Sequence, residues 1–326
     1  MSKELDIVGI GNAIVDVLSK TDDAFLHNNR IHKGTMTLIE APQAEALYSK
    51  MGTGIEMSGG SAANTVAAFA SLGGKSGYIG KIAHDQMGNV FRHDIRAAGV
   101  AFDTPPLVQG VPTAQCLILI TPDAQRTMCT YLGACALLNS TDLDGEMIRR
   151  AKVTYLEGYL FDRDQAKQAF RKAAKLAHAA GRKVALTLSD PFCVERHRGE
   201  FLELVRDHVD ILFANEAEIK SLYQVDHFSK ARPPCELAVI TRSAEGSVAI
   251  HGDARVEIAA APVAKVVDTT GAGDAYAAGF LYGYTREKSL ADCGRIASLV
   301  AAEIISHVGA RSQRNLAQLL RDRNAA

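Results

Sequence analysis

The chain has 326 residues and a formal net charge of −1 at pH 7, and 47% of its residues are hydrophobic and 22% charged. These are ordinary values for a globular protein, and a chain of this length buries about 75% of the surface that its unfolded form exposes. We expect neither nucleic-acid nor membrane partners, because the charge is balanced and no apolar run approaches the ~20 residues of a membrane span. The six cysteines show no C-x-x-C pair and no zinc-finger spacing, and no apolar leader precedes the first strand, so we expect a reduced protein in the cytoplasm.

The first predicted element is a buried strand at residues 6–11, which ends in glycines. It does not open a dinucleotide-binding turn, because Ile14 replaces the third glycine of that fingerprint and no helical pattern follows. An apolar, strand-like run over residues 12–18 follows instead and contains Asp16. A carboxylate in such a run is costly to bury unless something pairs with it. Asp16 is therefore either a turn or edge residue or a group that binds substrate hydroxyls.

A strand is predicted at residues 34–39 and a helix at residues 41–48. Gly59 and Gly60 then precede a helix of small residues, so a ligand can approach its N-terminus closely. Asn64 lies in the first turns of that helix, where its amide can both donate and accept hydrogen bonds. A Gly-Gly turn before a helix is also common without any ligand, and the residues alone leave both interpretations open.

A β-hairpin is predicted from residues 114–121 and 126–132, joined by a turn at Pro122-Asp123. Together with the strands at 12–18 and 34–39 it can form a small second sheet. Four hairpin side chains are placed to line the inner face of that sheet: Cys116, Met128, Thr130 and Leu132. Arg126 follows the hairpin turn, and it is either a solvated charge at the tip or a functional residue.

Helices and strands alternate after residue 140. Helices are predicted at 143–152, 163–180 and 200–209, and strands at 153–157, 183–188 and 210–214. This alternation predicts a parallel sheet with helices on both faces, a three-layer α/β/α arrangement. Ligands bind such sheets at the carboxyl ends of the strands, and every candidate motif in the chain follows a predicted strand.

Polar residues follow two of these later strands. Asn215 comes directly after one, and Glu218 three residues on gives the spacing of a variant capping box or of a pair of polar ligands. The strand that ends at Thr241 leads into a loop that closes at Gly246. Near the end of the chain, residues 301–310 are predicted to form a helix with a glycine stop. His307 on that helix is either structural or a ligand contact.

The most specific pattern lies at residues 268–280, which a short predicted strand at 265–267 precedes. Gly271, Ala272 and Gly273 allow a ligand to approach the main chain, and a buried helix of small residues follows. The unpaired N–H groups and the dipole of the new helix favour an anion such as phosphate. Asp274 lies in the first turn beside this site. It is either the N-cap of the helix or a base that accepts the proton of a hydroxyl attacking phosphorus.

This string resembles the second signature of the PfkB (ribokinase-like) carbohydrate kinase family, which includes adenosine kinases, and residues 77–88 resemble the first signature. The resemblance extends over essentially all of residues 1–326. It implies a single domain with a three-layer α/β/α core and a small β-sheet lid, formed by about residues 13–40 and 103–133. It also implies ATP-dependent phosphoryl transfer, in which the amides of Gly271, Ala272 and Gly273 bind the transferring phosphate and Asp274 is the catalytic base. The sequence contains no Walker A string and no protein-kinase H-R-D or D-F-G set.

The same resemblance implies roles for residues on the substrate side of the site. Asp16 corresponds to an aspartate that binds the sugar hydroxyls, with Asn12 as a weaker partner. The residues that correspond to a G-G-x-x-x-N pattern lining the sugar pocket are Gly59, Gly60 and Asn64. Cys116 lies on the lid face, and Arg126 is similar to an arginine linked to lid closure.

On the nucleotide side, Asn215 and Glu218 resemble the N-x-x-E motif of the family, which organises Mg²⁺ and the nucleotide phosphates, with Glu218 acting on the metal through water. Thr241 and Gly246 belong to a nucleotide-binding loop, although Arg242-Ser243 departs from the commoner residues there. His307 lies in the element that flanks the ATP base.

Three strings are more similar to adenosine kinases than to ribokinases or fructokinases: Gly11-Asn12 with Asp16, residues 186–192 and residues 210–216. The apolar lid residues also suit a purine. We therefore expect phosphorylation of the 5′-hydroxyl of a ribonucleoside, adenosine to AMP, although residues 12–16 depart from the Asn-Pro-Leu-Leu-Asp of many adenosine kinases. A sugar kinase of ribokinase or fructokinase type is the alternative, and a non-catalytic ligand-binding regulator on the same fold is the third hypothesis. The sequence leaves open a monovalent-cation requirement and whether the protein is a monomer or a homodimer.

Overall fold

The computed structural model describes residues 4–123 and 125–324, so the expected single domain over 1–326 includes a few positions outside the described residues. A nine-stranded sheet runs through the body of the molecule, in the order β14-β13-β12-β11-β10-β9-β1-β5-β6. The seven strands from β12 to β6 are parallel, and β13 and β14 are antiparallel. Their bounds are β1 Leu5–Ile10, β5 Ser76–Ile79, β6 Ala101–Phe102, β9 Ala151–Glu157, β10 Lys183–Thr187, β11 Ile211–Asn215, β12 Leu237–Thr241, β13 Ser247–His251 and β14 Ala254–Ile258.

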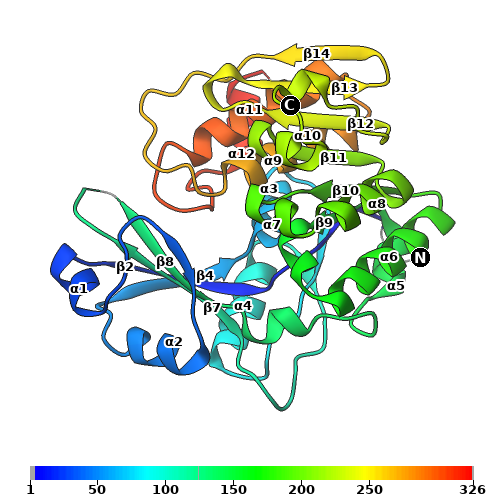
Figure 1. Ribbon diagram of the computed structural model, residues 1–326. Helices are drawn as coiled ribbons and strands as arrows, with labels where there is room; N and C mark the ends of the chain where they lie inside the picture. Colours follow the sequence, from blue (N-terminus) through cyan, green and yellow to red (C-terminus); the bar gives the residue numbers. More distant parts are fainter. Residues whose placement is uncertain (1–3, 124, 325–326) are drawn as a thin grey trace.

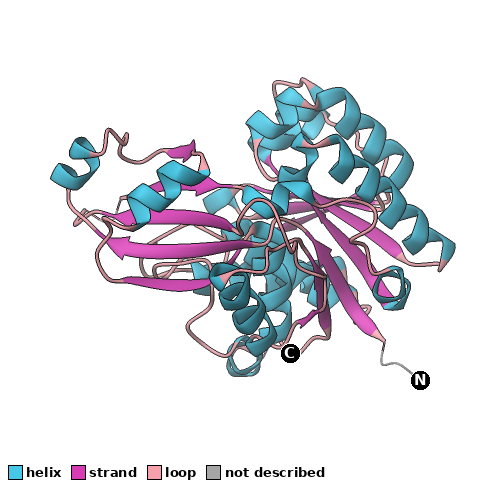
Figure 2. Ribbon diagram, turned by 90° about the horizontal axis from the view of Figure 1, so that it is seen from below, coloured by secondary structure: helices cyan, strands magenta, loops and turns pink. Residues whose placement is uncertain are grey.

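Helices cover both faces of this sheet, because its buried strands present apolar side chains to both sides. Alternate residues of β1 show this: Ile7 packs into one core cluster, and Val8 and Ile10 pack into the other. The first cluster is covered by α3 Ser61–Ser71, α4 Gln86–Ala97, α10 Ala272–Tyr284, α11 Leu290–Ile304 and α12 Leu316–Asp322. The second is covered by α5 Gly145–Arg150, α6 Asp164–Ala179, α7 Pro191–Arg196, α8 Arg198–His208 and α9 Glu216–Tyr223. The predicted three-layer α/β/α core is confirmed (Figure 2).

A second sheet of five strands extends from one side of this body (Figure 1). Its order is β3-β8-β7-β2-β4, with bounds β2 Ile14–Lys20, β3 Met36–Leu38, β4 Gly54–Gly59, β7 Ala114–Ile120 and β8 Arg126–Tyr131. The short helices α1 Asp23–Asn28 and α2 Ala41–Tyr48 belong to the same region. We call this sheet with its two helices the lid. The lid includes β4, which the expected segments 13–40 and 103–133 leave out.

The structure corrects two local predictions. Residues 265–267 are not a strand. Among the residues that the structure describes, no strand pairs with them, and the one backbone hydrogen bond they donate runs from the N–H of Val267 to the carbonyl of Ile305, at 2.8 Å. The Gly271 motif therefore does not follow a strand directly. The helix predicted over 301–310 is α11, which ends at Ile304, so His307 lies in the irregular segment beyond it. In the described ranges, the structure has no helix whose length and apolar character would allow it to cross a bilayer.

Candidate active site

The N-terminus of α10 forms a cradle of main-chain amides. Gly271 is its N-cap and has left-handed backbone angles (φ +77°), and a Cβ added there would lie 2.7 Å from the Cβ of Ala310, so glycine is required. A Cβ added to Gly273 would meet nothing within 4 Å, so space is open in front of the first turn. Within the described chain, no acceptor takes the N–H of Gly273 or Asp274. Free amides at the positive end of a helix dipole suit a phosphate group.

The carboxylate of Asp274 is held by α3, the neighbouring helix. Ser61 Oγ donates to its Oδ1 at 2.6 Å, and Asn64 Nδ2 donates to its Oδ2 at 3.3 Å. Asp274 is not the helix cap, since Gly271 occupies that position and no side chain among the described residues caps α10. Burial raises the pKa of Asp274 to about 6, against the opposing effects of Ser61, Asn64 and the Arg311 guanidinium. A carboxyl group that ionises just below neutral pH is suited to accept a proton.

Asp16 faces the same space from the lid. It pairs in register with Cys116, and a Cβ on Gly59 would lie 2.3 Å from Asp16 Oδ2, so the carboxylate rests directly on the main chain of β4. Among the described residues, none donates a hydrogen bond to Asp16. Burial raises the pKa of Asp16 to about 7; the charges of Arg311 and Arg126 oppose this rise, and the charge of Asp274 adds to it. Free carboxylate oxygens at this position can accept hydrogen bonds from hydroxyl groups.

Asn12 and the start of α3 are joined by Glu157, a buried carboxylate at the end of β9. Asn12 Nδ2 donates to Glu157 Oε1 at 2.8 Å, and the N–H of Ala62 donates to Oε2 at 2.8 Å. Gly60, which precedes α3, is its N-cap. Burial raises the pKa of Glu157 to about 7. Glu157 therefore fixes the loop after β1 against the N-terminus of α3.

Arg126 ties the lid to the cradle. Its Nη2 lies 2.8 Å from Asp268 Oδ2, and its Nη1 donates to Thr270 Oγ1 at 3.0 Å. The side chain is only 9% exposed, so the solvated-tip alternative is wrong. Asp268 also accepts from the N–H groups of Thr270 and Gly309, and it thereby shapes the turn that leads into Gly271.

The predicted nucleotide-side residues lie at neighbouring strand ends. Asn215 and Thr241 pair in register at the carboxyl ends of β11 and β12, and Gly246 lies just before β13. The capping-box interpretation of Asn215 is confirmed: its N–H and Nδ2 donate to the two oxygens of Glu218 at 2.9 and 2.7 Å. Burial raises the pKa of Glu218 to about 7, and the charges of Asp190 and Asp274 add to the rise.

His307 lies in the segment after α11, where its Nε2 is 3.2 Å from Glu303 Oε1. No cluster of three or more potential metal ligands occurs in the part of the chain that the structure describes.

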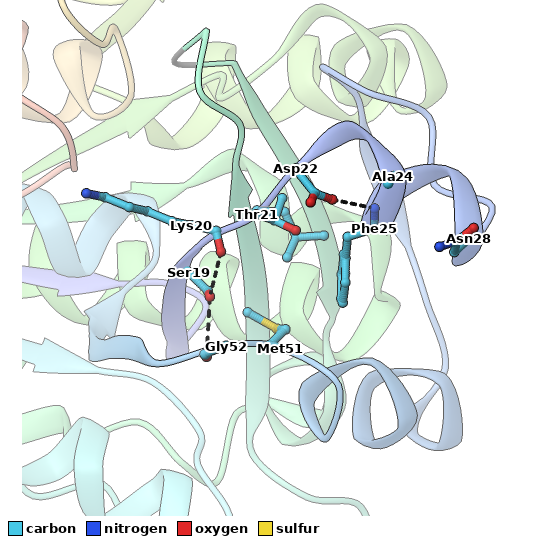
Figure 3. Close-up of a pocket in the computed structure, with 10 residues that line it drawn as sticks. Ser19, Lys20, Thr21, Asp22, Ala24, Phe25, Asn28, Met51 and Gly52 are labelled. Carbon is cyan, nitrogen blue, oxygen red and sulfur yellow. Dashed lines mark hydrogen bonds between the residues drawn. The ribbon is translucent and has the colours of Figure 1, made fainter.

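A separate cavity of about 590 Å³ opens at the outer end of the lid, between α1 and the segment before β4 (Figure 3). Phe25 and Met51 line it together with the Ser19–Asp22 segment. None of the predicted site residues lies among its walls.

Three residues of the site were missed by the sequence reasoning. Ser61 follows the Gly59-Gly60 pair directly, and its place at the first position of a predicted helix was the available signal. Glu157 ends an apolar strand, where a lone carboxylate is itself unusual. Arg311 has no such signal, because only the fold brings it to Ser58 of β4.

Comparison with known proteins decides the family. Residues 36–316 match the sequence profile of the pfkB family carbohydrate kinases. The chain belongs to the pfkB family. It is therefore a small-molecule kinase that uses an alcohol group as phosphoryl acceptor, and the family implies ATP as the donor.

Several relatives illustrate the range of this pfkB group. An adenosine kinase structure from Sinorhizobium meliloti is 51% identical, with a TM-score of 0.89, and covers 99% of this chain and 100% of its own. A probable sugar kinase structure from Rhizobium etli is 47% identical, with a TM-score of 0.91 and full coverage of both chains. A 5-dehydro-2-deoxygluconokinase from Halalkalibacterium halodurans is 29% identical over 93% of this chain and 89% of its own length. The names of these relatives thus include both a nucleoside kinase and sugar kinases.

Proposed function

We propose that this pfkB kinase transfers the γ-phosphoryl group of ATP to the 5′-hydroxyl of adenosine and releases AMP and ADP. The observation that carries the proposal is the inner face of the lid, the face that bears Asp16. Residues paired in register share one face of a sheet, so Asp16, Cys116, Thr130 and Leu38 form one row across it.

A second row lies two residues further along the strands, about 7 Å away, and it is entirely apolar. Its members are Met36, Met128, Ile118, Leu18 and Ile55. Met36 and Ile55 at its two ends are 52% and 64% exposed, and Leu38 in the first row is 58% exposed. Apolar side chains left open beside a hydroxyl-binding carboxylate suit a ligand with a polar ribose and a flat, apolar base. The 51% identity to the Sinorhizobium meliloti adenosine kinase supports the same choice.

In the proposed reaction the acceptor hydroxyl lies between Asp16 and the cradle. Asp274 removes its proton as the oxygen forms a bond to the γ-phosphorus, the bond from that phosphorus to the β–γ bridging oxygen breaks, and ADP leaves. The amides of Gly271, Ala272 and Gly273 stabilise the charge on the transferring group. Asp16, with Asn12, Gly59, Gly60 and Asn64, holds the sugar, and the lid with Cys116 and Arg126 excludes water.

On the nucleotide side, we assign Thr241, Gly246 and His307 to contacts with ATP, and Asn215 and Glu218 to the magnesium ion and the phosphates. Glu218 fits a water-mediated role, because its two oxygens accept one hydrogen bond each and an ionised carboxylate offers about four acceptor positions. Magnesium usually keeps several waters and needs few protein ligands; when bound, it neutralises phosphate charge. A cytoplasmic location agrees with this chemistry, since ATP is the co-substrate.

A sugar kinase is the second candidate, and the Rhizobium etli relative at 47% identity favours it. In that case the acceptor hydroxyl, the base and the cradle keep their places, and the apolar row of the lid would have no part in the choice of substrate.

The deciding experiment measures Mg-ATP-dependent ADP release with adenosine, inosine, guanosine, cytidine, ribose, fructose and fructose 6-phosphate, with the product mass checked. We expect adenosine to give the highest kcat/KM. The control is Asp274→Asn, which keeps the shape of the side chain and its contacts with α3; turnover should fall by about 10²–10⁴-fold with an unchanged unfolding temperature. Turnover of a free sugar alone would overturn the nucleoside assignment, and near-wild-type turnover of Asp274→Asn would overturn the base. Tight binding of one ligand without any turnover would instead support the non-catalytic regulator.

A further inference from the structure

The segment after α11 connects the phosphate cradle to the lid. The N–H of Gly309 donates to Asp268 at 2.8 Å, and Ala310 packs directly on Gly271. Arg311 then reaches β4, where its Nη2 donates to the carbonyl of Ser58 at 2.8 Å and to Ser58 Oγ at 2.9 Å. Three consecutive residues therefore join the cap of α10 to the strand that supports Asp16.

The charges of three carboxylates, Asp94, Asp16 and Asp274, act on the Arg311 guanidinium. Asp94 of α4 accepts hydrogen bonds from the N–H and Oγ of Ser58, at 2.8 and 2.6 Å, so it sits directly behind the arginine contact. The charge of the guanidinium also opposes the rise in the pKa of Asp16 and Asp274 that burial causes. Burial lowers the pKa of Arg311 itself, and the charges of Asp94, Asp16 and Asp274 oppose that fall. The Nε atom of Arg311 is buried and has no hydrogen-bond partner within the described residues.

Other charged groups face Asp16 and Asp274 from the surrounding elements. The two cations are Arg311 and Arg126. The carboxylates, besides the pair themselves, are Glu157 of β9 and Glu218 of α9. The neutral titratable groups in range are Cys116, Tyr155 and Tyr159, whose pKa values burial raises. Arg126 is already paired with Asp268, so Arg311 is the cation that both Asp16 and Asp274 share.

We propose that Arg311 is a positioning residue for phosphoryl transfer: its charge allows Asp16 and Asp274 to face one substrate together, and its bonds to Ser58 fix the cradle relative to the lid. This inference rests on the proposed function only in that both carboxylates act on the same acceptor. It holds for a nucleoside or a sugar.

The test compares Arg311→Met with Arg311→Lys and with Arg314→Met. Arg314 lies on the same segment, and its side chain is 58% exposed and pairs with Asp322, so its variant is the matched control. The kcat/KM of each is measured from pH 5.5 to 9 with the best acceptor of the substrate panel. In Arg311→Met the acidic limb of the kcat/KM profile should move to higher pH by about one unit or more. At pH values below the limb, kcat/KM should therefore fall by about a further tenfold. Arg311→Lys should recover most of the shift, and Arg314→Met should match the wild type.

A purely structural role would give the same fractional loss at every pH, and that result, or no loss at all, overturns the inference. A second readout does not depend on turnover: the carboxyl ¹³C resonance of Asp274 is titrated in the folded protein, and its midpoint should rise in Arg311→Met. If Arg311→Met does not fold, the Asp274 resonance is titrated in Arg311→Lys and Ser58→Ala instead. If the best acceptor is a sugar, the adenosine proposal fails while the Arg311 test still stands.

Discussion

Ser61 offers the sharpest test of the catalytic geometry, because it makes one short hydrogen bond to the proposed base. Its Oγ lies 2.6 Å from Asp274 Oδ1, and this bond lowers the pKa of a carboxyl group that burial raises to about 6. A net hydrogen bond is worth about 1 kcal/mol, somewhat more when one partner is charged. One pKa unit corresponds to about 1.4 kcal/mol. Ser61→Ala should therefore raise the pKa of Asp274 by about one unit.

The sign of the effect on rate follows from the role of the base. Only ionised Asp274 can accept a proton, so kcat/KM should rise with pH through the pKa and level off above it. In Ser61→Ala this acidic limb should lie about one pH unit higher, while the plateau at pH 8.5 to 9 falls by less than about tenfold, since Asn64 still holds the other oxygen. ADP release from pH 5 to 9, at saturating ATP and limiting acceptor, measures both quantities.

The matched control is Ser71→Ala, the same change at the other end of α3. Ser71 Oγ accepts the N–H of Leu316, so this variant loses a hydrogen bond of the scaffold without touching Asp274. Its acidic limb should stay in place. An unmoved limb in Ser61→Ala, or an equal shift in both variants, would refute the reasoning.

Three further variants and one control test the cradle and the lid. Gly271→Ala should lower the free energy of unfolding by at least about 1–2 kcal/mol, because the left-handed backbone of Gly271 disfavours a side chain and the added Cβ would meet Ala310. The Cβ added in Gly273→Ala meets nothing, so this variant should keep the stability of the wild type. Its kcat should fall by at least about tenfold, because the methyl group fills the proposed phosphate space. Urea melts and ADP release separate the two, and the reverse pattern would contradict the cradle. Ile55→Asp should raise the KM for adenosine by about tenfold or more at a nearly unchanged unfolding temperature, since a carboxylate would enter an apolar row at a 64% exposed position. Val108→Asp, at a 78% exposed site outside both sheets, is its control, and an equal KM effect there would remove the lid from the choice of substrate.

Local signals allowed much of this fold to be predicted from the sequence. The hairpin of β7 and β8, the helix at 41–48 and the start of α10 all depend on residues close together in the chain, such as Pro42 at the N-terminus of α2 and Gly271 before Ala272. The strand predicted at 265–267 was wrong for the opposite reason: its β-branched residues have a strand pattern, but the described part of the chain provides no partner strand for them. β4 escaped prediction because its pairing with β2 crosses some forty residues of sequence.

The same contrast applies to the candidate site. Asp274 and its glycines stand in one string, and Asn215 and Glu218 are three residues apart, so spacing alone placed them. Ser61 and Arg311 act across 213 and 253 residues of sequence, and nothing near either residue indicates its partner. Glu157 likewise joins Asn12 and Ala62 over 145 and 95 residues. Such contacts arise only when the parallel sheet brings distant strand ends to one edge.

The place of α10 in the chain sets the order in which the protein acquires its parts during synthesis. Asp16, Ser61 and Asn64 leave the ribosome early, and 210 residues separate Asn64 from Asp274. At about 5–20 residues per second, a nascent chain carries these proposed substrate-side groups for roughly 10 to 40 s before the proposed base and phosphate cradle are made. Because α3 packs against α10, the face of α3 that α10 covers also stays exposed until α10 is made. A ribosome that stalls before residue 271 therefore holds a chain that lacks both the proposed base and the proposed phosphate cradle.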